Sequence, residues 1–261
     1  MPFQINTNLD ALSAYNALAK VNASTTKAQL KLATMKRINS VADDTSGFRV
    51  GKELEAENLR YQAQLGNISS AKNWLATGES ALMQVLDKLN QIDAKQQDAL
   101  DPLKNQNALA EDVRVLANEI DNILQNTTIN GVNVLASANQ NFGAGTTLTV
   151  NIGAQIGDNA TTITALTASG TGNLTTNINT FRNNIKTSLG YIGNRAQTFD
   201  SREEFITAAK LNNTATISRF FDADMAMEQL NVTKGQIGIQ IGTAMLSQVN
   251  VAPQSLLSLF R

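Results

Sequence analysis

The residues that most often carry catalysis are absent from this chain or poorly placed in it. It has no histidine and no cysteine, which argues against zinc and copper sites, Ser–His–Asp triads and Cys–His pairs. Glu203–Glu204 could do acid–base work, but adjacent helical positions point apart, so solvated charge is the simpler interpretation. Asp43–Asp44 lacks the further oxygen ligands and the spacing of a calcium loop. We therefore expect no enzyme activity, metal or cofactor, and look for function in surfaces.

Both ends of the chain are nearly uncharged and rich in aliphatic side chains. Across residues 1–26 and 229–261 the only charged residues are Asp10, Lys20, Lys234 and Arg261. Ordering such ends costs roughly 1–2 kcal/mol per residue in backbone entropy, and each buried aliphatic side chain returns about 1.5–3 kcal/mol. The ends should therefore be marginal in a monomer and stable once other copies cover them. The main functional signal is self-assembly.

Charge and hydropathy disfavour several other partners. The net charge is −1 and the pI about 5.6, which gives no electrostatic footprint for nucleic acid. The first residues lack a basic region followed by an apolar one, so a Sec signal peptide is not expected. The most apolar stretch, residues 237–260, is interrupted by polar residues and a proline, so we predict no membrane insertion.

Apolar residues recur with alternating spacings of three and four in four stretches, the pattern of coiled-coil seams. The first two are Ala11, Ala14, Leu18, Val21, Thr25, Ala28, Leu32, Met35 and Ile68, Ala71, Leu75, Gly78, Leu82, Val85, Leu89, Ile92. The third and fourth are Leu109, Val113, Leu116, Ile120, Ile123 and Met227, Leu230, Lys234, Ile237, Ile241, Ala244. An amphipathic helix of a globular bundle can show one such run, but four runs predict an elongated bundle.

Local sequence signals mark helix boundaries and one region where strands replace helices. Residues 40–43 and 201–204 fit the capping-box pattern of a helix start, and Asp101-Pro102 should end a helix. Between about residues 127 and 173, Asn130-Gly131 predicts a hairpin turn. Strands are predicted at Leu148, Val150 and Ile152 and again over residues 161–164, and the helical pattern resumes near Ile178.

Four blocks and the start of the chain resemble the bacterial flagellins. Residues 36–48, KRINSVADDTSGF, resemble the "RINSAADDAAGL" signature, and NGVNVL at 130–135 is similar to "FNGxxLL". Residues 218–226, SRFFDADMA, are similar to "SRIxDADxA", and the ending PQSLLSLFR resembles "PQxVLSLLR". The start INTN at 5–8 is also of the family type. The blocks lie in order over nearly the whole chain.

The resemblance implies a fold and a division of the chain. The fold would be mainly α, an elongated antiparallel helical bundle or coiled coil with paired N- and C-terminal helices and a small β-hairpin insertion. Residues 1–45 with 216–261 would form a terminal coiled-coil domain that lines the inner tube of a filament. Residues 46–135 with 174–215 would form a helical domain of the outer tube, and residues 136–173 a short variable β-rich insert.

The resemblance also implies a function and partners. The chain would be a self-assembling structural subunit of the bacterial flagellar filament, secreted by type III export and used for swimming. Its partners would be other flagellin subunits, the flagellar export apparatus and export chaperone, and the filament cap and hook–filament junction proteins. The expected self-assembly interface comprises Ile5, Leu9, Leu12, Leu18, Val21, Ile237, Ile241, Leu246, Leu256, Leu257, Leu259 and Arg261. The expected inter-domain junction comprises Arg37, Asn39, Asp43, Asp44, Asp222 and Asp224, with local capping as the alternative role for its first four residues.

The chain departs from the family pattern at two places. Met35-Lys36 stands where Ser-Gly is typical. Asp93 replaces the central arginine of the helix that the innate flagellin receptor recognises, so weak receptor activation is predicted.

Three other functions are alternatives to that of a filament subunit alone: a hook–filament junction protein, a filament subunit that doubles as a hydrolase and a generic coiled-coil adaptor. The zinc peptidase chemistry of some flagellins requires histidines that this chain lacks, and an adaptor would not need charge-poor ends.

Overall fold

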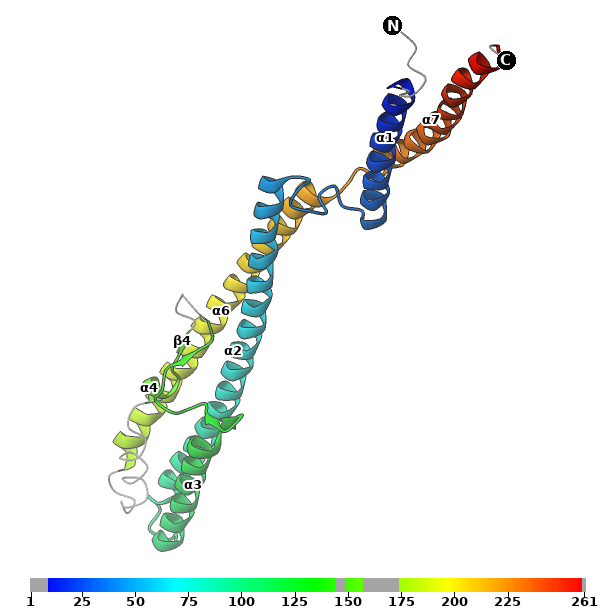
Figure 1. Cartoon of the computed structure of the whole chain (residues 1–261). Helices are drawn as coiled ribbons and strands as arrows, with labels where there is room; N and C mark the ends of the chain where they lie inside the picture. The colour runs from blue at the N-terminus through cyan, green and yellow to red at the C-terminus, as the bar shows by residue number, and fades with distance from the viewer. Residues whose placement is uncertain (1–8, 144–148, 157–173, 260–261) are drawn as a thin grey trace. The chain divides into compact units, whose positions relative to one another are not determined.

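The computed structural model describes residues 9–143, 149–156 and 174–259. The fold is mainly α-helical, with short strands in one region, and the predicted fold class is confirmed (Figure 1). The helices are α1 Leu9–Thr34, α2 Thr45–Asp98, α3 Gln106–Asn126, α4 Gly153–Ile156, α6 Leu174–Phe221 and α7 Met225–Leu259. The strands are β1 Thr128–Ile129, β2 Val132–Asn133, β3 Gln140–Asn141 and β4 Thr149–Val150.

The chain divides into two compact units that both contain parts of α2 and α6. The terminal unit comprises Met1–Asn58 and Lys210–Arg261, and the middle unit comprises Leu59–Ala209. In the terminal unit, α1 and α7 lie side by side and run antiparallel (Figure 1). The pairing of the N- and C-terminal helices is therefore as predicted.

The middle unit holds an aliphatic core to which α2, α3 and α6 all contribute. All eight residues of the second predicted seam are buried, from Ile68 to Ile92, and α6 adds the fully buried rings of Phe181 and Phe199. The third seam is buried or half-buried on α3. Helix α2 ends at Asp98, just before Asp101-Pro102, because proline cannot donate the next helical hydrogen bond.

The β region adds two small hairpins to this core. Strands β1 and β2 pair antiparallel around Asn130 and Gly131, whose φ angles of 51° and 78° fit the predicted two-residue turn. Strands β3 and β4 also pair antiparallel. Val150 and Ile152 are buried, but Ile152 lies beyond β4, so the predicted strand is shorter than its alternation indicates. Leu148 and the predicted run over 161–164 lie outside the described residues.

Both predicted capping boxes need correction as helix starts. Ser40 and Asp43 do form capping-type hydrogen bonds, but these close a turn, and α2 begins at Thr45 with Asp44 as its cap. Ser201 lies inside α6, which runs unbroken from Leu174 to Phe221. No glycine or proline interrupts the helix near Ser201, and Glu203 bonds Lys72 of α2 instead of capping.

Candidate assembly surface

Helices α1 and α7 meet closely because glycines of α7 face the seam of α1. A Cβ added to Gly235 would lie 2.1 Å from the Oγ1 of Thr25, one on Gly238 3.2 Å from Val21, and one on Gly242 2.8 Å from Leu18. Residue numbers rise on one helix as they fall on the other, which fixes the antiparallel register. Lys31 and Glu228 close one end with an ion pair of 3.5 Å.

The seam of α1 is the predicted one, but the seam of α7 is not. On α1 the partly or fully buried positions include those predicted from Ala11 to Leu32, and Met35 alone of that stretch is exposed beyond the helix end. On α7 the face toward α1 carries Glu228, Val232, Gly235, Gly238, Ile239, Gly242, Leu246 and Val249. The prediction was wrong here because it sought large side chains, whereas glycine permits the closest approach of two backbones. The missed signal was the spacing of the glycines themselves.

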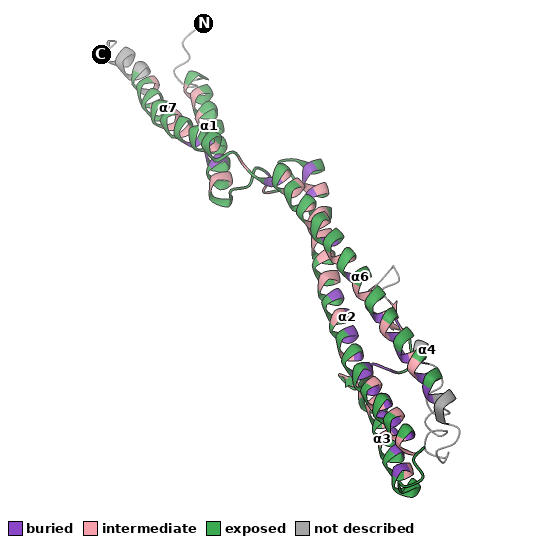
Figure 2. Cartoon of the chain, turned by 180° about the vertical axis from the view of Figure 1, so that it is seen from behind, coloured by how far each residue is buried: buried purple, intermediate pink, exposed green. Residues whose placement is uncertain are grey.

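The predicted seam of α7 is instead an exposed stripe that is apolar apart from Lys234. Ile237 and Ile241 are 51% and 55% exposed, and the stripe is completed by Met227, Leu230, Ala244 and Met245. At 3.6 residues per turn this stripe is centred roughly 150° around the helix from the face that meets α1. Figure 2 accordingly colours much of α1 and α7 as exposed. One helix therefore carries two apolar faces, of which one lacks a cover within the described residues.

Helix α1 repeats this arrangement. Its exposed stripe, without a charged residue, comprises Leu9, Leu12, Tyr15, Ala19, Ala23 and Leu30. We call this set and the exposed set of α7, Met227, Leu230, Ile237, Ile241, Ala244 and Met245, the open stripes. An amphipathic helix of a monomer needs only one apolar face, so a second one indicates that a further partner covers it.

The residues expected at the self-assembly interface fall into three groups. Leu9, Leu12, Ile237 and Ile241 lie on the open stripes, whereas Leu18, Val21 and Leu246 lie on the seam between α1 and α7. A groove of about 710 Å³ brings Val21, Ile237 and Ile241 together. Ile5 and Arg261 lie outside the described residues, as do the side chains of Leu256, Leu257 and Leu259, although α7 extends to Leu259.

The predicted junction residues cluster where two connecting segments pair. The backbone N–H of Arg37 donates to the carbonyl of Phe221 at 2.6 Å, and the N–H of Ala223 donates to the carbonyl of Met35 at 3.0 Å. The guanidinium of Arg37 adds a bond of 3.0 Å to the carbonyl of Phe220. The segment after α1 is thus tied to the segment before α7.

The polar residues of this junction cap turns and helices. The Asp43 carboxylate accepts from the backbone N–H and hydroxyl of Ser40 and from the N–H of Asn39. These bonds, that of the Ser40 N–H first, hold the pKa of Asp43 below its ordinary value. Asp44 accepts from the Gly47 N–H at 2.9 Å.

Asp222 and Asp224 complete the junction on the other segment. Asp222 accepts from the Ser218 hydroxyl, and Asp224 caps α7 through the N–H groups of Ala226 and Met227. Asp224 therefore has a local capping role like that of Asp43 and Asp44, whereas Asp222 forms a local side-chain bond at the end of α6.

An aromatic contact that the sequence did not predict packs the start of α2 onto the end of α6. Phe48 and Phe221 meet edge to face with ring centres 6.2 Å apart, and a Cβ on Gly51 would lie 1.7 Å from the Phe221 ring. Only glycine fits at position 51. Gly47 and Gly51 lie one helical turn apart, which was the signal available in the sequence.

Neither a metal cluster nor a membrane span is present in the described part of the chain. No group of three potential ligands gathers there, and none of the described helices has a window apolar enough to cross a bilayer. The functional features of the described residues are the apolar stripes on the helices and the backbone hydrogen bonds that hold the connecting segments together.

Two family models match most of the chain. The bacterial flagellin N-terminal helical region matches residues 5–140, and the bacterial flagellin C-terminal helical region matches residues 173–260. The flagellar filament 33 kDa core protein of Treponema phagedenis and flagellin FlaB2 of Treponema pallidum are each 27% identical, over 98% of this chain and 99% of the relative. A flagellin of Listeria monocytogenes is 26% identical over the same shares.

The fold and its surfaces define an α-helical structural protein with paired ends and apolar faces suited to assembly. The family matches then specify which one. The chain belongs to the bacterial flagellins. It is a subunit of the flagellar filament, the extracellular fibre that bacteria use to swim, and it polymerises with other flagellin subunits. The matched proteins are filament proteins, and nothing in them favours the hook–filament junction.

Proposed function

We propose that the open stripes of α1 and α7 are the surfaces that neighbouring subunits bury in the filament. The carrying observation is the second apolar face of α7, where Ile237 and Ile241 are exposed although α1 already covers the opposite side. Burial of one large aliphatic side chain contributes about 1.5–3 kcal/mol. Several of them on each of two helices supply enough free energy for polymerisation and explain why so few charges occur there.

In this proposal the predicted domains keep their assigned roles, and the predicted interface residues do so except for Leu18, Val21 and Leu246, which pack within the subunit. Residues 1–45 with 216–261 line the inner tube, residues 46–135 with 174–215 form the outer tube, and residues 136–173 are the insert. Ile5, Leu256, Leu257, Leu259 and Arg261 extend the interface toward the chain ends. The junction residues Arg37, Asn39, Asp43, Asp44, Asp222 and Asp224 set the path of the chain between the tubes. We further propose export through the flagellar type III apparatus with its chaperone, and contact with cap and hook–filament junction proteins.

Charge substitution on an open stripe tests the proposal. Ile241→Lys should abolish precipitant-induced filaments seen by electron microscopy, because an unpaired charge cannot be buried between subunits without a large cost. Gln236→Lys is the matched control, since Gln236 is exposed on α7 outside both apolar faces. Circular dichroism should show the same helix content in both variants. If Ile241→Lys polymerises as readily as Gln236→Lys, the open stripes are not the interface. Leu257→Lys extends the test toward the C-terminus.

We also propose that this flagellin activates the innate flagellin receptor weakly. Asp93, in place of the family's arginine, forms an ion pair of 3.2 Å with Arg182, so the charge that a receptor would meet is reversed and held in place. Asp93→Arg should raise the response of receptor-bearing cells to monomeric protein, with Asp87→Arg as an exposed control on the same helix. A strong response to the unmodified monomer would contradict the proposal.

A further inference from the structure

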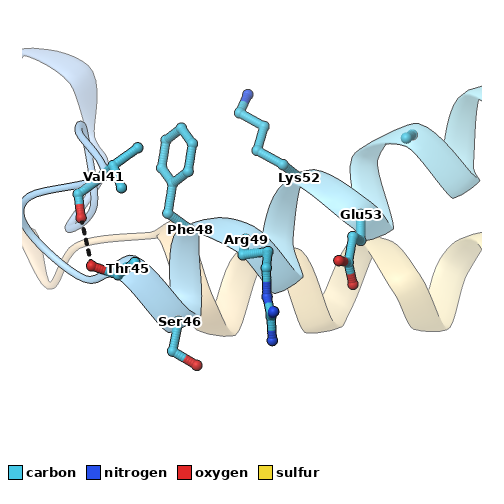
Figure 3. A pocket seen from close by; sticks show the side chains of 8 residues that line it. Val41, Thr45, Ser46, Phe48, Arg49, Lys52 and Glu53 are labelled. Carbon is cyan, nitrogen blue, oxygen red and sulfur yellow. Dashed lines mark hydrogen bonds between the residues drawn. The ribbon is translucent and has the colours of Figure 1, made fainter.

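An apolar groove runs along the first turns of α2 in the terminal unit. It has a volume of about 750 Å³ and is lined by residues that include Val41, Phe48 and Ala56, with Arg49, Lys52 and Glu53 among its polar members (Figure 3). Val41 is exposed although it is a large aliphatic residue. Phe48 and Lys52 project from the same side of α2, and the Lys52 ammonium lies 5.7 Å from the Phe48 ring centre. The lining is thus mainly apolar, and its charged residues are Arg49, Lys52 and Glu53, of which Lys52 pairs with Glu55 at 2.7 Å.

The loop between α2 and α3 in the middle unit presents exposed apolar side chains on a projecting turn. Leu100 and Leu103 are 76% and 93% exposed, and Leu103 leads all large hydrophobic residues in the described chain in exposed fraction. The loop is nevertheless well tied. Asp98 pairs with Lys104 at 2.6 Å, and Asp101 accepts from the Leu103 N–H at 3.0 Å. A braced turn that presents two leucines is a shaped apolar projection.

We propose that this loop inserts into the groove of a second copy, so that Leu100 and Leu103 contact Phe48 and Val41 of the next subunit. The inference rests on the proposed function, since it names a further contact between filament subunits. Charge supports the choice of occupant: the loop from Asp98 to Lys104 has a net charge of −1, and because Asp98 pairs with Lys104, Asp101 is the carboxylate that this loop can offer to a cation. Arg49, which makes no ion pair with the described residues, is available to meet Asp101.

The geometry of growth supports a second copy over a different partner. Groove and loop are different patches of the same chain, and a contact between unlike patches is heterologous. Such contacts repeat from subunit to subunit and produce open helical filaments unless the rotation closes a ring. A contact between two identical patches would stop at a dimer. A filament subunit therefore requires at least one pair of unlike, complementary surfaces, and here an apolar projection with Asp101 can meet an apolar groove with Arg49.

Disulfide mapping tests the contact without a background signal because the chain has no cysteine. Full-length Ser46→Cys and Leu103→Cys are mixed, added to seeds of the unmodified protein, oxidised and separated on a non-reducing gel. Ser46 lines the groove, and Ser80→Cys, at an exposed position of α2 outside both surfaces, replaces it in the control mixture. We expect covalent dimers at least about tenfold in excess of the control, because the contact raises the local thiol concentration. Leu103→Cys alone should give none.

Each other outcome is also decisive. Filaments that contain both variants, yet show no excess of dimer for this pair or for Ala56→Cys with Leu100→Cys, overturn the proposed contact and leave the open stripes untouched. If the unmodified protein forms no filaments, the proposed function fails instead. If Leu103→Cys keeps its helical spectrum but does not join the seeds, while Ser80→Cys does, the loop is required for growth and the proposal is supported.

Discussion

Gly235 and Thr25 are in direct backbone-to-side-chain contact across the seam between α1 and α7. A Cβ at Gly235 would lie 2.1 Å from the Thr25 Oγ1, which itself donates to the Val21 carbonyl at 2.7 Å. Thr25 is buried, so its side chain cannot swing into solvent without opening the seam. The helix spacing is thus set by the absence of a side chain, and replacement of Gly235 should separate the pair.

Gly235→Ala should destabilise the terminal helix pair by about 1–3 kcal/mol, the usual cost of overpacking. Gly66→Ala is the matched control, because Gly66 is also helical but nothing lies within 4 Å of an added Cβ. That variant should gain about 0.5–1 kcal/mol from helix propensity. Hydrogen exchange of the α1 and α7 amides checks the predicted loss, and exchange of the α2 amides checks the predicted gain. Equal protection in the two variants would mean that the seam is looser than the structure indicates.

Met35→Gly should stabilise the end of α1. Met35 has a φ of 58°, in the left-handed region just after the last helical residue, Thr34. Glycine is favoured at this position because it has no Cβ penalty there. Relief of that penalty, reduced by the larger entropy of glycine in the unfolded chain, should yield about 0.5–1 kcal/mol. Thermal unfolding measured by circular dichroism tests this, and Leu32→Gly, within the helix, should lower the melting temperature instead.

The sequence predicted what depends on regular repetition and missed what depends on close contact. Large aliphatic residues from Ile68 to Ile92 recur with one period, so their shared burial could be read directly. The seam of α7 was assigned to Ile237 and Ile241 because large side chains usually mark a buried face. Three glycines in fact occupy that face, and whether a glycine marks a turn or a close approach depends on the helix opposite it.

The candidate site shows the same limit. The aspartates at positions 43 and 44 were predicted at the junction from the resemblance to flagellins, with local capping, which suits aspartate, as the alternative. The Phe48–Phe221 contact joins residues far apart in the sequence, and no local pattern states which ring covers Gly51. The exposure of Leu103 follows from the path of a loop that Asp98 and Lys104 brace across a proline. Such features depend on tertiary contacts, which a local sequence pattern does not specify.

Lys72→Met should weaken the packing of α2 on α6 by less than about 1 kcal/mol, since the pair is partly exposed and screened by salt. Lys72 contacts Asp200 at 2.6 Å and also Glu203, and these bonds, that to Asp200 first, raise the pKa of Lys72 above its ordinary value of 10.5. A raised lysine pKa contributes stability that is complete below 10.5 and lost as pH rises through the folded-state value. The free energies of unfolding of the unmodified protein and the variant should therefore become equal at alkaline pH.

The matched control for Lys72 is Lys186→Met, because Lys186 is exposed on α6 and makes no ion pair with the described residues. Urea unfolding at neutral and alkaline pH measures both variants. If the difference in free energy of unfolding between Lys72→Met and the unmodified protein grows at alkaline pH, the ion pairs of Lys72 do not stabilise the packing as proposed.

Asp43→Asn should make the junction less stable at neutral pH and leave it unchanged in strong acid. The carboxylate accepts from Ser40 and Asn39, and these bonds lower the pKa of Asp43 below its ordinary value of 3.8. A lowered carboxyl pKa contributes stability that is present above 3.8 and lost as pH falls through the folded-state value. Asparagine keeps one acceptor oxygen without the charge, so the variant isolates the contribution of the charge to the stability of the junction.

Hydrogen exchange at the Asn39 and Ser40 amides, measured from about pH 2 to 7, should differ between the variant and the unmodified protein only above the pH at which Asp43 loses its proton. Asp87→Asn, at an exposed position of α2, should show no such dependence, and a constant difference across the range would assign the effect of Asp43 to shape instead of charge.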